Sequence, residues 1–218
     1  MADMNLAMQN YAMKLGEYVW DEILKKTEGS DLNKTLSEIN NGNSTLDQET
    51  VTDIIQKLGG TFIVFSDEYS KEKKESEKTS SEESVDDLMR KHLKEKFNVK
   101  SDICGDSYFV KLDEKASCFE IGCKRFNLMN SIHELGHLFL DADRCNVNCI
   151  IWDDGTLNQS EYLANAFARA LIMPLKRFVE KVTMSSDNSG CNIFDVASFF
   201  GVEYTNAYIR GKELMLWN

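Results

Sequence analysis

Apolar side chains recur every three or four residues along much of the chain, the spacing that puts them on one face of a helix. This pattern predicts a long amphipathic helix over residues 3–26 and shorter helices near 31–39 and 47–58. A further helix is predicted from Ser84 to Phe97, because Ser84 is a favourable helix start and an apolar face follows it.

The second half of the chain repeats the helical spacing with clear breaks between segments. Pro174 ends one helix and can open the next, since a first helical turn does not need its missing N–H group. The helices predicted there cover residues 124–140, 159–173, 175–184, 193–200 and 204–216.

Three short segments follow a strand pattern instead. Residues 61–65, 108–113 and 118–121 are rich in β-branched and aromatic side chains and are flanked by turn-forming residues. We expect them to form a small sheet, and we expect residues 141–158 to form an irregular loop. The sequence therefore predicts an α+β fold, mostly helical, with a small β-sheet packed on the helix over 124–140.

Domain boundaries are predicted where the pattern changes. Residues 1–46 are expected to form an N-terminal helical extension, 47–184 the core, and 185–218 a C-terminal helical segment. Residues 70–84 contain no apolar side chain, so we expect a flexible charged insertion in the core, with a charged partner-binding tail as the alternative.

Composition narrows the choice of partners and compartment. The 218 residues carry a formal net charge of −11, which disfavours direct binding to nucleic acid. No run approaches the roughly 18 apolar residues of a membrane span, and the N-terminus lacks the features of a signal peptide. We therefore expect a cytoplasmic protein whose six cysteines are reduced thiols.

The chemistry-bearing motif is His133-Glu-Leu-Gly-His137. Residues four apart share a helix face, so His133 and His137 can offer two imidazoles to one metal ion. Glu134 lies beside them, where its carboxylate can take a proton from a water that the metal activates. Taken alone, the motif also fits a buried helix with two histidines at its rim.

A third ligand is expected on the following helix. Glu161 lies 24 residues after His137, and Asn165 one turn later is placed to hold a ligand histidine through its other ring nitrogen. Asp143 is the rival third ligand. Tyr162 is a candidate oxyanion donor. The remaining histidine, His92, falls on the apolar face of its own predicted helix, so it is expected to pack there rather than to bind metal.

Longer motifs surround these residues. They are Arg125-Phe126 with His133-Glu-Leu-Gly-His-Leu-Phe-Leu140, Glu161-x-x-Ala-Asn-x-Phe-Ala-x-x-Leu-Ile-Met-Pro174, Val196-Ala-x-x-Phe-Gly-Val202 and Ala207-Tyr-Ile-Arg210. Together they resemble the ImmA/IrrE family of metallopeptidases. The likeness extends from about residue 47 to 215 and is strongest over 125–174. Two departures are Leu163, where many relatives have a further acid, and a longer interval between Phe126 and His133.

The resemblance implies a zincin-like metallopeptidase core and a cytoplasmic, zinc-dependent endopeptidase with one Zn²⁺ per chain. It implies that His133, His137 and Glu161 are the metal ligands and that Glu134 is the general base. Relatives cleave helix-turn-helix repressors of phages, other mobile elements or stress regulons, so the implied partner is a DNA-binding repressor.

Two other functions stay open: a non-catalytic zinc-containing module that sequesters a regulator, and a zinc-free structural domain. The last two predicted helices could form a helix-turn-helix of their own. Glu203 and Glu213 balance Arg210 and Lys212 there, which favours packing or protein docking over DNA binding.

Overall fold

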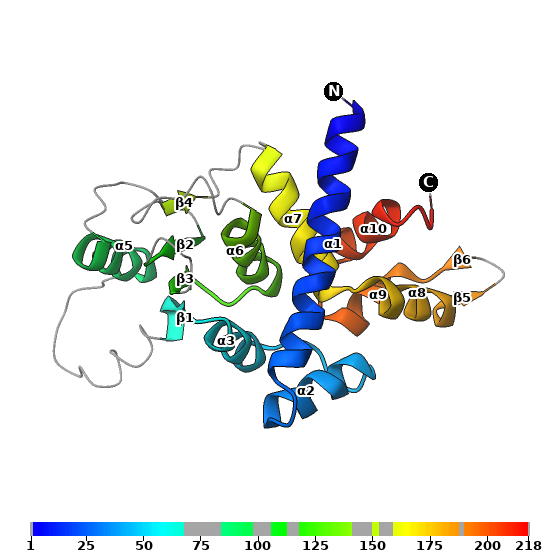
Figure 1. Ribbon diagram of the computed structural model, residues 1–218, viewed down its shortest axis with the longest axis horizontal. Helices are drawn as coiled ribbons and strands as arrows, with labels where there is room; N and C mark the ends of the chain where they lie inside the picture. The colour runs from blue at the N-terminus through cyan, green and yellow to red at the C-terminus, as the bar shows by residue number, and fades with distance from the viewer. Residues whose placement is uncertain are drawn as a thin grey trace.

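The computed structural model describes residues 2–67, 84–97, 106–112, 118–140, 150–152, 159–187 and 190–217. Figure 1 shows a small sheet at one side of the molecule and a larger group of helices beside it. The charged insertion predicted over 70–84 lies outside the described residues, apart from Ser84.

The predicted helices are confirmed, with ends that differ by a few residues from the expected ones. They are α1 (Ala2–Lys26), α2 (Asp31–Asn40), α3 (Gln48–Lys57), α5 (Val85–Phe97), α6 (Leu128–Leu140), α7 (Gln159–Ile172), α8 (Leu175–Met184), α9 (Ile193–Phe200) and α10 (Tyr204–Glu213).

Helix α6 begins later than the predicted residue 124 because the backbone of Lys124 still belongs to the sheet. The Lys124 N–H donates to the Asp106 carbonyl at 2.8 Å, and the Ser66 N–H donates to the Lys124 carbonyl at 2.9 Å. The side chain of Asn127 then accepts from the Asn130 N–H at 3.0 Å, which satisfies a free donor of the first helical turn. The apolar periodicity alone could not locate this boundary.

The three predicted strands are confirmed and belong to a mixed sheet in the order β1-β3-β2-β4. Strand β1 (Gly60–Val64) runs parallel to β3 (Phe119–Cys123), and β2 (Ser107–Lys111) runs antiparallel to β3. The expectation of an irregular loop over 141–158 was wrong in part, because β4 (Ile150–Trp152) pairs with β2. Three apolar residues are too short a run for the strand pattern to detect.

A second, two-stranded ladder occupies the break that the sequence predicted after α8. Strand β5 (Ser186–Asp187) pairs antiparallel with β6 (Gly190–Cys191). This hairpin joins α8 to α9 and lies at the far end of the molecule from the four-stranded sheet (Figure 1).

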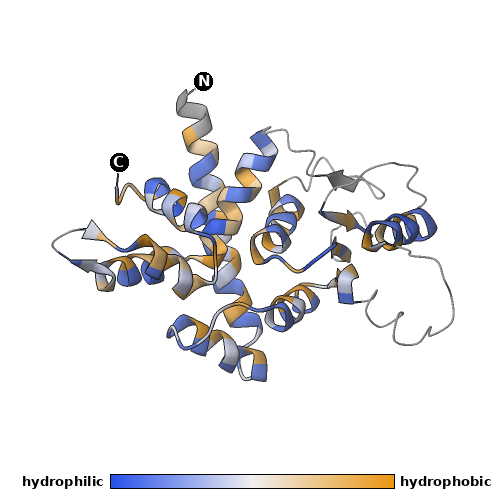
Figure 2. Cartoon of the chain, turned by 180° about the vertical axis from the view of Figure 1, so that it is seen from behind, coloured by the Kyte–Doolittle hydropathy of each residue, from blue (hydrophilic) through white to orange (hydrophobic). Residues whose placement is uncertain are grey.

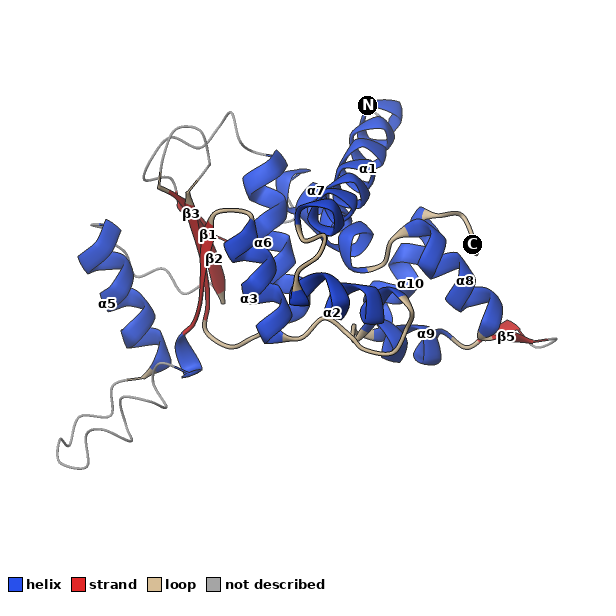
Figure 3. Cartoon of the chain, turned by 60° about the horizontal axis from the view of Figure 1, so that its bottom comes forward, coloured by secondary structure: helices blue, strands red, loops and turns tan. Residues whose placement is uncertain are grey.

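Helices cover both faces of the four-stranded sheet, with α6 and α3 on one side and α5 on the other (Figure 3). Side chains alternate between the faces with the period of two of a strand. On β2, Phe109 packs into the core that contains α6, whereas Tyr108 and Val110 pack against Leu88 and Met89 of α5. Strands β2 and β3 are therefore buried on both faces.

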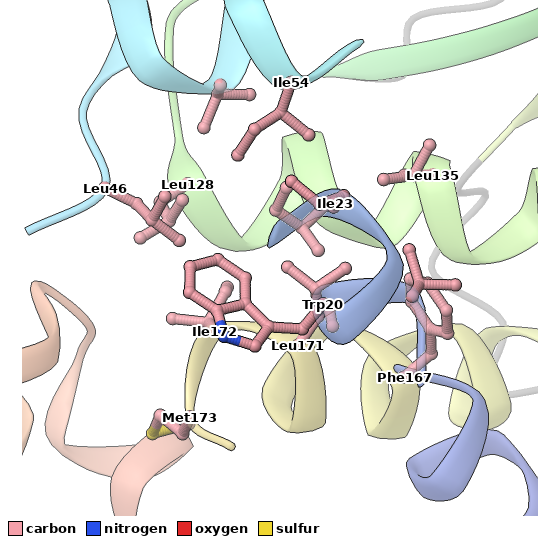
Figure 4. Packing of buried hydrophobic residues seen from close by; sticks show 14 of the residues in the cluster. Trp20, Ile23, Leu46, Ile54, Leu128, Leu135, Phe167, Leu171, Ile172 and Met173 are labelled. Carbon is pink, nitrogen blue, oxygen red and sulfur yellow. The ribbon is translucent and has the colours of Figure 1, made fainter. Parts of the chain in front are cut away.

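The main hydrophobic core lies on the face of the sheet that α6 covers. Residues from all three predicted segments of the chain contribute to it. Trp20 and Ile23 of α1 lie among side chains of α6 and α7 (Figure 4). Phe200 and Ala207 bring the C-terminal helices into the same cluster. The predicted boundaries at 46/47 and 184/185 stay predictions, but the segments share one core.

Helix α1 packs along α7 more closely than side chains of ordinary size would allow. A Cβ atom at Gly16 would lie 2.5 Å from the Phe167 carbonyl oxygen, so glycine is needed where the two helices touch. Figure 2 shows apolar and polar residues on opposite sides of most helices, as expected for amphipathic helices that surround one core.

The C-terminal helix α10 is held by buried charges. Arg210 is fully buried; its Nε donates to the Met173 carbonyl at 3.0 Å and its Nη2 to Glu17 at 2.7 Å. Arg169 of α7 pairs with Glu213 at 2.6 Å. The guanidinium group of Arg210 is thus used for hydrogen bonds inside the fold and is not exposed at the surface, where a partner could bind it.

Candidate metal centre

Helices α6 and α7 lie side by side and bring the predicted ligands together (Figure 1). His133 and His137 are one turn apart on α6, and Glu161 is in the first turn of α7. Gly136 allows the approach, since a Cβ there would lie only 3.1 Å from the Cα and the carbonyl oxygen of Ala164. A glycine is therefore needed where the two helices touch.

The three side chains form a compact triangle of ligand atoms. His133 Nε2 lies 3.0 Å from Glu161 Oε2, His137 Nε2 lies 3.2 Å from Glu161 Oε1, and the two Nε2 atoms are 3.0 Å apart. All three residues are buried. Ligand atoms that lie about 2.0–2.1 Å from a tetrahedral zinc are about 3.3 Å from one another, so the triangle is close to the size that zinc requires.

The chemistry of the donors fits the same ion. Two imidazoles and one carboxylate are ligands that Zn²⁺ accepts, and three protein ligands leave one of four positions free. Among the described residues, His133, His137 and Glu161 are the group of His, Cys, Asp and Glu side chains that could hold a metal ion. The rival ligand Asp143 lies outside the described residues.

The carboxyl group of Glu161 is adapted to an ionised state. Burial raises its pKa, but the hydrogen bonds with His133 and His137 outweigh that effect and lower the pKa to about 2. A carboxylate that stays ionised is available as a ligand over the whole physiological pH range.

Glu134 differs from Glu161 in its surroundings. Its carboxylate is buried, and burial raises its pKa, an effect that the charge of His133 and the hydrogen bond from Ser107 oppose only in part. Ser107 Oγ donates to Oε1 at 2.7 Å, whereas Oε2 has no hydrogen-bond partner among the described residues. A buried carboxylate oxygen without a partner is typical of a group that awaits a ligand or water.

Strand β2 and the start of α7 supply contacts that the sequence did not predict. Phe109 stacks on the ring of His137, with centroids 5.8 Å apart and planes 9° from parallel. Ser160 Oγ lies 3.4 Å from His137 Nδ1, the ring nitrogen that faces away from the other ligands. Alternation within 107–111 does place Ser107 and Phe109 on one face, but only the folded chain shows which helix that face meets.

Two neighbouring residues make contacts other than the expected ones, and their expected roles stay predictions. Asn165 was expected to hold a ligand histidine, but its Nδ2 donates to the backbone carbonyl of Glu161 at 2.8 Å, because that carbonyl lies one turn back in the same helix. Tyr162 was considered as an oxyanion donor. It is 43% exposed, whereas its helix neighbour Glu161 is buried beside the two histidines, so Tyr162 lies on a different face of α7.

His92 packs against Phe65 and Phe97, as its place on an apolar helix face predicted. Its Nε2 lies 2.8 Å from Glu120 Oε1, and Glu120 also accepts hydrogen bonds from Lys96 and Tyr108. This group joins α5 to the sheet on the face opposite to α6. A cavity of about 590 Å³ borders α3, β1 and α5 nearby, and it includes none of the residues of the metal centre.

The chain matches no protein-family model, no curated protein and no solved structure. Within the described residues, every helix is too short or too polar to span a bilayer. The geometry of the centre and the sequence motifs are therefore the basis for a function.

Proposed function

We propose that this chain is a zinc-dependent endopeptidase in which His133, His137 and Glu161 hold one Zn²⁺ and Glu134 is the general base. One observation carries the proposal: three buried ligands converge from adjacent helices beside a buried carboxylate with a free oxygen. Structural zinc sites use four protein ligands, whereas catalytic sites use three and keep one position open. The ligand count therefore favours catalysis over a purely structural metal.

Zinc in this centre would supply a Lewis acid that polarises a peptide carbonyl and makes a water molecule more acidic. The residues of the chain then have separate tasks. Glu134 accepts the proton of the attacking water on its free oxygen and passes it to the amine that leaves as the C–N bond breaks. The raised pKa of Glu134 suits this role, because a carboxylate takes up a proton more readily when its pKa is closer to the working pH.

The small mixed sheet packed on the ligand helix is compatible with a zincin-like core, which we include in the proposal. The resemblance to ImmA/IrrE metallopeptidases supports a helix-turn-helix repressor as the substrate and the cytoplasm as the compartment. The net charge of −11 supports the same choice, since a basic DNA-binding protein would be attracted to an acidic enzyme.

The test is to incubate the zinc-loaded protein with the repressor encoded next to it, with and without a chelator. A mass spectrum of the products identifies the cleaved bond, and the Glu134→Gln protein is the matched control with its ligands intact. Cleavage of the repressor that requires both zinc and Glu134 supports the peptidase. A stable stoichiometric complex without fragments supports a sequestering module instead, and purified protein without bound zinc contradicts both.

A further inference from the structure

Ser107 links the sheet to the proposed base. It is the first residue of β2, only 3% exposed, and it lies 27 residues before Glu134 in the chain. The pairing of β2 with β3, in which Ser107 is opposite Cys123, fixes its position relative to α6. The hydroxyl is thus presented by a rigid, doubly covered sheet.

The hydrogen bond makes the two oxygens of Glu134 different. An ionised carboxylate can only accept, so the Ser107 hydroxyl must donate its proton to Oε1. Oε2 is buried and has no partner among the described residues. A carboxylate without this contact could turn about its last bond, because that torsion has broad minima. The contact therefore selects Oε2 as the oxygen that is free to react.

The same strand face also contacts a ligand. Phe109, two residues after Ser107, stacks on His137. Residues two apart in a strand point to the same face, so β2 contacts the base through Ser107 and the His137 ring through Phe109. Both contacts come from outside the ligand helices and add to the contacts that α7 makes with His137.

We propose that Ser107 is a positioning residue that orients Glu134, so that Oε2 rather than Oε1 exchanges the proton with water and the leaving amine. This inference rests on the proposed peptidase function. Ser107 does not touch the substrate and acts only through the carboxylate of Glu134.

The kinetic test uses Ser107→Ala, Ser107→Cys and Ser107→Thr, with the neighbouring repressor as the substrate. Ser131→Ala is the matched control, because Ser131 is a fully buried serine of α6 whose hydroxyl donates to the Asn127 carbonyl at 2.8 Å. We expect kcat to fall about 10- to 100-fold in Ser107→Ala with unchanged KM and zinc content, as for other groups that orient catalytic ligands. Thr should restore kcat, and Cys, a weak donor of similar size, should lie between.

A kcat within about twofold of wild type in Ser107→Ala, or an equal loss in Ser131→Ala, overturns the role. Crystal structures of the zinc-loaded wild-type and Ser107→Ala proteins provide a test without turnover. We expect the Glu134 carboxylate to have one orientation with serine and to be rotated or doubled with alanine. An identical, well-ordered carboxylate in both proteins overturns the inference. If wild type cleaves nothing, the peptidase proposal fails, and this structural comparison decides on Ser107 by itself.

Discussion

Gly136 and Gly16 both lie where α7 contacts another helix, and adding one methyl group at each should have different consequences. At Gly136 the new Cβ would lie 3.1 Å from two backbone atoms of Ala164, so α7 must move by a few tenths of an ångström. At Gly16 the new Cβ would lie 2.5 Å from the Phe167 carbonyl oxygen, a much closer overlap. The first contact is close to the ligands, and the second is on the α1 side of α7.

The expected magnitudes follow from two opposing terms. Overpacking typically costs about 1–3 kcal/mol, whereas alanine favours a helix over glycine by about 1 kcal/mol. Gly136→Ala should thus lower the free energy of unfolding of the metal-free protein by roughly 0–2 kcal/mol, and Gly16→Ala by more. Zinc sites tolerate about 0.2 Å in their metal–ligand distances, so a shift of that size between α6 and α7 should weaken zinc binding about tenfold or more in Gly136→Ala.

The assays are urea unfolding of both metal-free variants and zinc titration in competition with a chromogenic chelator. The prediction is that the order of the variants reverses: Gly16→Ala loses more stability, and Gly136→Ala loses more zinc affinity. If the variant that loses more stability also loses more zinc affinity, the α6–α7 distance does not set the ligand geometry.

Three further predictions follow from other contacts. Glu134→Gln should bind zinc as wild type does, measured by metal analysis, and should lose cleavage; normal cleavage would contradict the role of the base. Burial raises the pKa of Glu120, but the hydrogen bonds that it accepts from His92 and Lys96 outweigh burial and lower this pKa. The ionised carboxylate therefore stabilises the fold above about pH 4.3, and this stabilisation is lost as the pH falls through the folded-state pKa. Glu120→Gln should therefore reduce the unfolding free energy at pH 7 and make its decline in acid shallower; an unchanged acid limb contradicts this. Glu213→Ala should cost about 3–5 kcal/mol in thermal or urea unfolding, because a buried arginine loses its partner; a loss below about 1 kcal/mol would show that water replaces the pair.

The sequence predicted the helices and the pairing of His133 with His137 because both depend on local spacing. The two histidines are one turn apart in any helix. Glu161 lies on a separate helix, so local spacing does not place it beside them. Ser107 and Phe109 could not be predicted, since their roles depend on how a strand and a helix meet in space. That placement is set by packing of the whole core, which no short pattern contains.

Two contacts in the structure were not predicted from the sequence. Asn165 satisfied its amide with the nearest carbonyl in its own helix, a local contact that competes with any longer reach. The amphipathic pattern over residues 3–26 predicted α1 correctly but not its partner, so α1 was expected to be an extension. Trp20 and Ile23 instead lie in the main core.

Helix α7 contacts α6 on one side and α1 along its length, from Gln159 to Leu171. Shortening the chain from its N-terminus would thus remove a helix that packs against α7, which carries Glu161. Trimming α1 would expose apolar surface of α7 and invite aggregation. Truncations intended for crystallisation or activity assays should therefore keep α1.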